Sequence, residues 1–275
     1  MPTKQYPAPG WRDYIAQWLD SLKAGAYAAS TINTRRCQLT AISQALDGSP
    51  LDVEASDLGA YCAGREWKPE TRKGARNACA GFFGWMFQTG HIDTDPSKAL
   101  PSVRRPHPHP RPCPDVVILK ALAQANDKER LMLRLGAEAG LRRFEIAKVS
   151  SRDLMRDLMG WSLMVIGKGD VQRMVPIGDE LADEIRANGP GYLFPGRWGG
   201  HVEASYVGKR LTRLLDGFSA HSLRHRYATR TYEATHDLLL VSKLLGHASV
   251  ETTQRYVAMP DSRLREAVGA SMLTA

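Results

Sequence analysis

Cysteine is scarce in this chain of 275 residues: four are present, and none stands in a C-x-x-C pair. The spacing of Cys37, Cys62, Cys79 and Cys113 therefore predicts reduced thiols rather than a zinc site or a disulfide framework. The sequence also lacks an apolar run near the roughly 18 residues of a membrane span, and it lacks the basic-then-apolar start of a signal peptide. These absences predict a soluble, cytoplasmic protein with no membrane partner.

Several motifs of common enzyme classes are missing as well. There is no G-x-x-x-x-G-K-[ST] phosphate loop, no G-x-G-x-x-G after a strand, no H-E-x-x-H and no G-x-S-x-G. His107 and His109 have no further ligand nearby, so we interpret them as solvated linker residues rather than a metal site. The sequence therefore predicts neither a metal nor a cofactor.

The composition does show a mild excess of positive charge. Lys and Arg number 37 against 29 Asp and Glu, which gives a formal net charge of +8. This excess suits a polyanionic partner, but alone it is weak evidence because many basic proteins never bind nucleic acid.

The clearest candidate for a domain boundary is a stretch in which proline occupies every second position from 106 to 114. Neither a helix nor a central strand tolerates that pattern, so we expect an extended, polyproline-like linker over residues 104–114. The sequence thereby predicts two domains, over residues 1–103 and 115–275.

The spacing of apolar residues before the linker predicts an all-helical domain with helices over about 11–24, 30–47, 53–62 and 69–88. Ser30 is the expected N-cap of the second helix, and the aromatic residues at 82–87 are assigned to the core. Cations at the starts of the second and fourth helices either grip phosphates or form a solvated face, and the pattern leaves both readings open. These cations are Arg35, Arg36, Arg72, Lys73 and Arg76.

The pattern after the linker is mixed. Helices are expected over about 115–125, 128–139, 143–149, 179–187, 204–215, 222–233, 238–245 and 250–256. Short β-like runs at 161–166 and 171–177 flank Gly-Lys-Gly-Asp, a turn composition that predicts an antiparallel hairpin. The predicted fold class is mainly α with two domains, the second being α+β with a small antiparallel sheet.

A set of cations and one phenol follows in order through the second domain. It comprises Ala139-Gly-Leu-Arg142-Arg-Phe-Glu145, Gly167-Lys168-Gly169, His221-Ser-Leu-Arg224, Leu245-Gly-His247 and then Tyr256. Each piece alone is weak, because an isolated H-x-x-R usually marks an amphipathic helix and G-K-G is usually only a turn. Together, in this order, they form a specific signal.

This order resembles the tyrosine recombinase (phage integrase) family. The family pattern has an arginine in a G-L-R turn, a hairpin lysine, H-x-x-R, G-H and a tyrosine in a T-T-x-x-Y context, which here reads GHASVETTQRY. The resemblance covers residues 115–260 and fills all six positions without substitution. It implies a site-specific recombinase that cleaves and rejoins DNA through a 3′-phosphotyrosine intermediate and a Holliday junction.

The residue types themselves suit the cleavage of a DNA phosphodiester. Attack on the phosphate adds negative charge to its non-bridging oxygens, so the site must supply fixed positive donors. Arg142 and Arg224 are suited to this because a guanidinium stays charged and meets two oxygens at once. His221 adds a donor or acts on the proton of the nucleophile, and His247 donates a further hydrogen bond.

Three further residues complete the predicted chemistry. Tyr256 is the candidate nucleophile, because surrounding cations ease the loss of its phenolic proton. Lys168, at the hairpin tip, is the expected proton donor to the leaving oxygen, with Arg173 and Lys209 as alternative cations. Glu145 lies one helical turn from Arg142 and is expected to orient it or a neighbouring histidine.

The resemblance also implies partners and architecture. The first domain is expected to be a SAM-like, four-helix core-binding domain that starts near residue 10, which predicts a compact form without an arm-binding domain. The implied partners are double-stranded DNA recombination sites, a homotetramer in the synaptic complex and, optionally, an accessory DNA-bending or directionality factor. A last helix after Asp261, with an apolar stripe of Leu264, Val268 and Met272, packs onto a neighbouring protomer or onto its own domain, and both remain open.

The wording of the GLRRFEIA and GHASVETTQRYVAMPD segments favours integration of a phage or mobile element. One alternative with the same chemistry is an Xer-like resolvase of chromosome or plasmid dimers. Others are a relaxing topoisomerase or hairpin-forming resolvase and, different in kind, a DNA-binding regulator with an inactive site.

Overall fold

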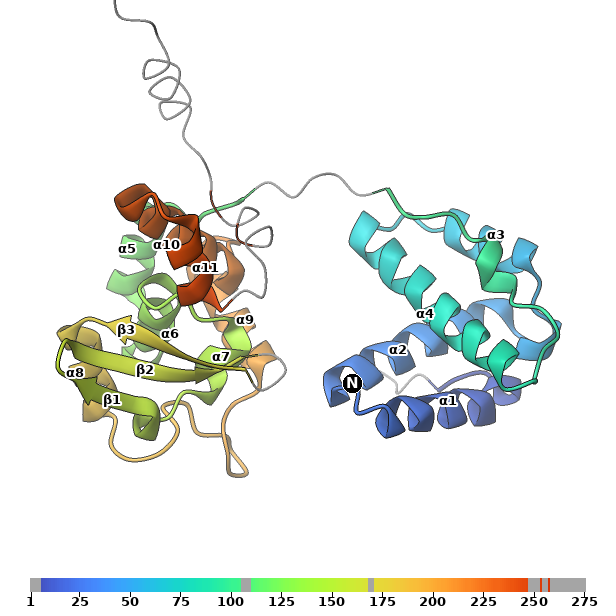
Figure 1. The fold of residues 1–275 in the computed structure, drawn as a ribbon, viewed down its shortest axis with the longest axis horizontal. Coiled ribbons are helices and arrows are strands. Elements are labelled where there is room, and N and C mark those ends of the chain that lie inside the picture. The colour runs from blue at the N-terminus through green and yellow to red at the C-terminus, as the bar shows by residue number, and fades with distance from the viewer. Residues whose placement is uncertain (1–5, 105–109, 168–170, 247–252, 254–256, 258–275) are drawn as a thin grey trace, which may run out of the picture. The chain divides into compact units, whose positions relative to one another are not determined.

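The computed structural model describes residues 6–104, 110–167, 171–246, 253 and 257. The chain divides into two compact units, Met1–His107 and Pro108–Ala275 (Figure 1). The first unit is helical, and the second combines helices with a small antiparallel sheet, which confirms the predicted fold class. Within the described ranges, no helix has the length and apolar character that crossing a membrane requires.

The helices of the first unit follow the predicted order. They are α1 (Arg12–Ala24), α2 (Ala29–Leu46), α3 (Ala55–Ala63) and α4 (Pro69–Gln88), with the short 3-10 turns η1 (Pro9–Trp11), η2 (Pro50–Asp52) and η3 (Pro96–Ala99). The prediction for Ser30 is wrong: α2 begins one residue earlier, and Ala28 occupies its N-cap without a side-chain hydrogen bond. Helix α3 begins at Ala55 and not at the predicted residue 53, because Glu54 is its N-cap and forms a capping box with Asp57.

The core of the first unit is aromatic. Phe82 of α4 lies 5.7 Å from both Trp11 and Trp18, measured between ring centroids. Gly81 allows this approach, because a β-carbon there would lie 2.9 Å from Trp18. Phe82 and Phe83 are fully buried, as the sequence predicts, whereas Phe87 is 41% exposed and lies outside the core. This packing fixes the second half of α4 against α1 and the turn before it.

The second unit has more elements. Its helices are α5 (Asp115–Gln124), α6 (Asp127–Ala137), α7 (Arg143–Lys148), α8 (Asp179–Ala187), α9 (Ala204–Leu214), α10 (Ala220–Thr235) and α11 (Leu238–Leu245), with the 3-10 turn η4 (Ser151–Asp153). Its strands are β1 (Leu154–Asp157), β2 (Gly160–Ile166) and β3 (Gln172–Ile177). Of the helix expected at residues 250–256, Thr253 alone is described, and the helix expected after Asp261 lies outside the described residues.

The sheet has the order β1-β2-β3, with both pairs antiparallel. The predicted hairpin is β2 and β3, which pair from Trp161 opposite Ile177 to Ile166 opposite Gln172. Strand β1 was not predicted. It pairs Leu154 with Leu163, but its residues are mostly exposed and therefore show no apolar alternation.

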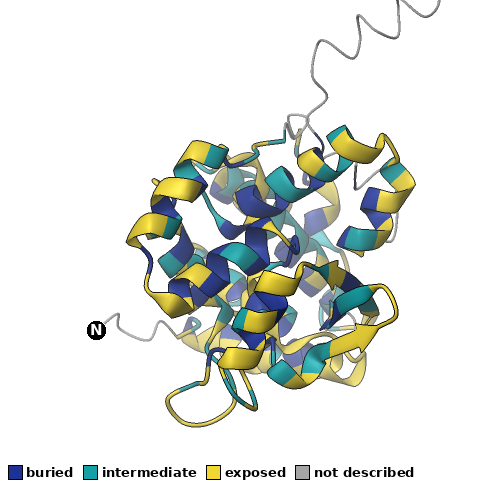
Figure 2. Cartoon of the chain, turned by 90° about the vertical axis from the view of Figure 1, so that its left-hand side faces the viewer, coloured by how far each residue is buried: buried dark blue, intermediate teal, exposed yellow. Residues whose placement is uncertain are grey.

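Helix α6 is the centre of the second unit. Leu131, Leu133 and Leu135 on this helix are buried at 1% exposure or less. A β-carbon at Gly136 would lie 2.7 Å from Leu223, so α6 and α10 approach closely there. Figure 2 shows such buried positions in dark blue on the inward faces of the helices. This contact places the start of α10 beside the end of α6, where the candidate site lies.

Candidate active site

An open pocket of about 850 Å³ lies among α7, α9 and α10 of the second unit. Five arginines or lysines and one histidine line it: Arg142, Arg143, Lys209, Arg213, His221 and Arg224. A concave surface with this many cations favours an anionic ligand. Three of the predicted catalytic residues, Arg142, His221 and Arg224, are therefore brought together at one pocket.

The G-L-R turn places Arg142 at the start of α7. Gly140 has φ +62°, and a β-carbon there would lie 2.5 Å from the ring of Tyr227, so the position requires glycine for two reasons. The Leu141 amide then donates to the Leu135 carbonyl (3.1 Å) and closes the end of α6. Arg142 follows as the N-cap of α7, and its own amide donates to Glu145 Oε2 at 2.7 Å. The turn thus fixes the backbone of Arg142 before its side chain reaches the pocket.

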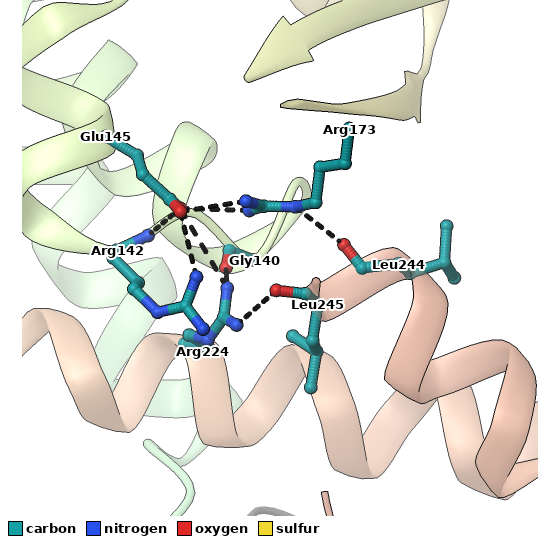
Figure 3. Close-up of polar contacts among 7 residues, drawn as sticks. All are labelled: Gly140, Arg142, Glu145, Arg173, Arg224, Leu244 and Leu245. Atoms are coloured by element: carbon teal, nitrogen blue, oxygen red, sulfur yellow. Dashed lines mark hydrogen bonds and ion pairs between the residues drawn. The ribbon is translucent and has the colours of Figure 1, made fainter. Parts of the chain in front are cut away.

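Glu145 binds two of the arginines at the site, Arg142 and Arg173 (Figure 3). Its side chain is fully buried and accepts a hydrogen bond from Arg142 Nη1 at 2.9 Å. Arg173 of β3 donates to both carboxylate oxygens, at 2.8 and 2.9 Å. Burial acts to raise the pKa of Glu145, but the hydrogen bonds and charges of Arg173 and Arg142 outweigh it and hold that pKa below its ordinary value. A charged Glu145 therefore holds two guanidinium groups in place.

Arg224 lies at the base of the pocket with its side chain fully covered. Its Nη1 donates to the Gly140 carbonyl and its Nη2 to the Leu245 carbonyl, both at 2.5 Å, and Nη1 lies 4.0 Å from Glu145 Oε2. Arg224 thus joins the G-L-R turn to the end of α11. A phosphate oxygen can contact Arg224 only after some of the groups that cover this side chain move. The positive charge of Arg224, however, attracts an anion in the pocket without any movement.

His221 stands one turn before Arg224 and keeps part of its surface exposed at the pocket. Its ring meets that of His225 edge-on, with centroids 4.6 Å apart. Burial of the imidazole, followed by the charges of His225, Arg224 and Arg142, lowers the pKa of His221 to about 4. The ring is therefore neutral at pH 7 and presents one N–H donor and one acceptor nitrogen.

The lowered pKa of His221 predicts a loss of stability in mild acid. The unfolded chain takes up a proton on this imidazole near the ordinary pKa of 6.5, whereas the folded chain does so only near 4. The free energy of unfolding should therefore fall as the pH drops from about 6.5 towards 4. Urea denaturation of the whole chain at pH 7 and pH 5 measures this change.

His221→Gln is the matched variant, because glutamine keeps a donor and an acceptor but does not titrate. We expect the wild-type chain to lose more stability between the two pH values than the variant does. Equal losses of stability in the two proteins would show that the fold does not lower the pKa of His221. Contributions from the first unit are the same in both proteins and cancel in the comparison.

The remaining predicted catalytic residues, Lys168, His247 and Tyr256, lie outside the described residues. Of the two alternative cations for the leaving oxygen, Arg173 is 8% exposed and committed to Glu145. Its Nε also donates to the Leu244 carbonyl at 3.1 Å. The donors of Arg173 are therefore occupied by protein groups, which disfavours it as the proton donor to the leaving oxygen. Lys209 of α9 is exposed on the pocket and remains an alternative to Lys168.

Three of the five cations proposed to contact DNA in the first unit hold internal partners. Arg72 donates to the carbonyls of Cys62 and Arg65 at 2.6 and 2.8 Å. Arg76 donates to the carbonyls of Pro101 and Leu100 at 2.8 and 3.2 Å.

Arg35 donates to Gln38 and to the Gly74 carbonyl. Arg36 is exposed, and Lys73 is half-buried. The sequence pattern does not indicate that Arg35, Arg72 and Arg76 hydrogen-bond to other groups of the first unit. The contacts of all five cations with DNA stay predictions.

Sequence reasoning missed two cations of the pocket and the role of a third residue. Arg143 and Arg213 line the pocket beside the predicted residues. The available signal was the four-residue spacing of Lys209 and Arg213, which puts both on one face of α9. Arg173 was considered only as a proton donor, whereas it is the main partner of Glu145. No group of three or more His, Cys, Asp or Glu suited to a metal ion occurs among the residues that the structure describes.

Known proteins are similar to this chain over about two thirds of its length. The model of the phage integrase family matches residues 116–263. Tyrosine recombinase XerC of Xanthomonas axonopodis pv. citri (strain 306) is 30% identical over 213 residues, covering 71% of this chain and 69% of that protein. Tyrosine recombinase XerC of Xylella fastidiosa (strain M23) is 33% identical over 198 residues, covering 66% of this chain and 67% of that protein.

Solved structures share the fold at lower identity. A lambda integrase dimer bound to a COC′ core site matches with a TM-score of 0.75 and 20% identity, over 90% of this chain and 76% of that one. XerH recombinase bound to its difH substrate matches with a TM-score of 0.68 and 20% identity, over 94% and 85%. The extent of the family match, together with relatives at this identity and coverage, shows that the chain belongs to the phage integrase family and is a tyrosine recombinase.

Proposed function

We propose that the chain cleaves and rejoins DNA strands through a covalent phosphotyrosine formed by Tyr256. The observation that carries this proposal is the gathering of Arg142, His221 and Arg224 at one pocket that opens to solvent. A buried carboxylate holds Arg142 in place, so a fixed cation is ready before any phosphate arrives. Preorganised charge of this kind is the largest contribution that a protein makes to phosphoryl transfer.

In the proposed step, the phenolic oxygen of Tyr256 attacks the phosphorus atom of one DNA strand. The new bond joins phosphorus to the phenolic oxygen, and the bond between phosphorus and the 5′ oxygen breaks. The phenol gives up its proton, and the departing 5′ oxygen gains one and leaves as a hydroxyl group. Attack by a 5′ hydroxyl from another strand reverses the step, so that rejoining needs no ATP.

Arg142 and Arg224 offset the negative charge that grows on the non-bridging oxygens. His221 is suited to the phenolic proton, because its neutral ring keeps an acceptor nitrogen at pH 7. His247 and Lys168 are proposed from the sequence motif, as a further donor to the phosphate and as the acid for the 5′ oxygen.

Both units are proposed to contact the DNA. Residues 115–275 form the catalytic domain in this proposal, and residues 1–103 bind the core of the recombination site. Of the five cations predicted to contact DNA, Arg36 is the exposed one, whereas Arg35, Arg72 and Arg76 also hold internal groups. Four copies are proposed to act together on two duplexes, and an accessory DNA-bending or directionality factor is compatible with this arrangement.

For the biological role, we propose integration of a phage or another mobile element, as the wording of the catalytic motifs indicates. The relatives named XerC favour a second candidate, an Xer-like resolution of chromosome or plasmid dimers. The two roles differ in their DNA: resolution joins two copies of one site, whereas integration joins two different sites.

A duplex selection experiment tests these proposals. The purified chain first selects binding sites from a random-sequence duplex pool, and the selected duplex is then nicked at successive positions near its centre. We expect a covalent protein–DNA adduct that survives denaturation, and its absence on every nicked duplex would favour the inactive regulator. Plasmids that carry two identical selected sites, or one selected site and one variant site, then separate the roles. Preference for unlike sites supports integration, and preference for identical sites supports resolution.

A further inference from the structure

Arg173 of β3 joins two other segments of the second unit, α7 and the end of α11, with one side chain. Its two terminal nitrogens donate to the two oxygens of Glu145 at 2.8 and 2.9 Å, and its Nε donates to the Leu244 carbonyl at 3.1 Å. The side chain is 8% exposed. A guanidinium is the only side chain that makes a forked pair with a carboxylate and keeps a further donor for a third group. Figure 3 shows this bridge between Glu145 and the end of α11.

The same ion pair lies near the turn end of the β2–β3 hairpin. The Gly167 amide donates to the Val171 carbonyl at 2.8 Å and closes the described part of this hairpin. A β-carbon at Gly167 would lie 3.6 Å from Glu145 Oε1 and 3.7 Å from Arg173 Nη1, which is van der Waals contact. Gly167 immediately precedes Lys168 in the sequence, so the pair lies near the described residue that leads to that lysine.

Arg173 also packs on the residue that ends α11. Gly246 has φ +64°, and a β-carbon there would lie 2.7 Å from Arg173 Cδ, so a larger residue would push the arginine away. Gly246 immediately precedes His247. One arginine is therefore bound to the carboxylate that holds Arg142, packs at Gly246 in front of His247, and lies near Gly167, the residue before Lys168.

We propose that Arg173 is a positioning residue for strand cleavage, which sets the hairpin of Lys168 and the end of α11 against Arg142. This inference rests on the proposed function, in which Lys168 protonates the leaving 5′ oxygen. Arg173 is not itself the acid, because its donors are already directed at Glu145 and Leu244. A misplacement of reacting groups by about 1 Å costs up to roughly a hundredfold in rate, so loss of this bridge should be visible in the chemical step.

Arg173→Met removes the bridge, and Arg173→Lys keeps a cation beside Glu145 without the fork. Arg134→Met is the matched control: Arg134 pairs with Glu138, Glu180 and Glu184 in the same unit but lies outside the pocket. The substrate is the nicked duplex selected by the wild-type chain. Single-turnover cleavage, duplex affinity and thermal unfolding are measured for each variant.

We expect Arg173→Met to slow cleavage by roughly tenfold to a hundredfold while its affinity for the duplex changes by less than about threefold. Arg173→Lys should be intermediate, and it decides the matter if Arg173→Met fails to fold. Arg134→Met should lose thermal stability yet cleave at the wild-type rate. Cleavage at the wild-type rate by both Arg173 variants would overturn the proposal.

A change of leaving group separates positioning from a general loss of stability. A bridging 5′ phosphorothiolate leaves as a thiolate and needs no proton, so it should rescue Lys168→Ala and most of the Arg173→Met defect. A general loss of folded protein would lower cleavage of both substrates equally, and absence of rescue in Arg173→Met alone would overturn the assignment. Absence of an adduct with the wild-type chain would instead refute the proposed function itself.

Discussion

Replacing Tyr256 with phenylalanine is expected to abolish the covalent protein–DNA adduct and leave duplex binding within about twofold. The substitution removes one oxygen atom, and the proposed intermediate needs that oxygen as its bond to phosphorus. The pocket cations that attract the phosphate are unchanged, so affinity for the selected duplex should persist. Denaturing gel electrophoresis of the nicked duplex and a filter-binding titration measure the two quantities.

Tyr192→Phe is the matched control for this variant. Tyr192 is 44% exposed and packs edge-on against His201, outside the lining of the pocket. It should form the adduct at the wild-type rate. An adduct of undiminished yield in Tyr256→Phe would assign the nucleophile to another residue.

Arg142→Ala is expected to lower the rate of strand cleavage by roughly a hundredfold to a thousandfold, the usual effect of removing one donor to a transition-state oxyanion. The variant leaves Glu145 paired with Arg173, so the buried carboxylate keeps its principal partner. The loss should therefore appear in the chemical step rather than in folding. Single-turnover cleavage under saturating protein measures it.

Arg142→Lys and a surface control sharpen this expectation. Lysine keeps the charge but cannot meet two phosphate oxygens in a fork, so its rate should fall between those of wild type and alanine. Arg186→Ala removes an exposed arginine of α8 that pairs with Asp183 outside the pocket, and it should cleave normally. Equal rates for Arg142→Ala and Arg186→Ala would remove Arg142 from the catalytic machinery.

Sequence periodicity located the elements that carry strong local signals. The predicted bounds of α4, α8 and α11 agree with the structure because each has a clear start or stop, such as Pro69 at the first turn of α4 and Gly246 after α11. Strand β1 is not predicted from the sequence, because the turn that joins it to β2 consists of Leu158 and Met159. Both residues are apolar and almost fully exposed, and this pair is not a typical two-residue hairpin turn such as Asn-Gly or Asp-Gly.

The site was predictable where its partners are close in sequence. Arg142 and Glu145 are three residues apart at the start of a helix, and their contact follows from helix geometry. The Arg173–Glu145 pair joins residues 28 positions apart, and the bond from Arg224 to the Leu245 carbonyl spans 21. Such contacts depend on how the hairpin and α11 pack, which a cation in a strand pattern does not reveal.

The cations of the first unit illustrate a further limit. A run of arginines on helix faces reads equally well as a phosphate-binding surface or as a solvated one. The structure shows a third use, in which Arg72 and Arg76 satisfy carbonyl groups of the segments around them. Composition reports the number of positive charges, and only the fold reports which of them hold the protein together.

The central claim is that the pocket cations act on the charge of a single scissile phosphate. A duplex with a neutral methylphosphonate at that position tests it directly, because the charge that Arg142 is meant to offset is then absent. We predict that the cleavage defect of Arg142→Ala, relative to wild type, shrinks from roughly a hundredfold to a thousandfold on the phosphate to less than about tenfold on the methylphosphonate. An undiminished defect on the neutral substrate would contradict the claim.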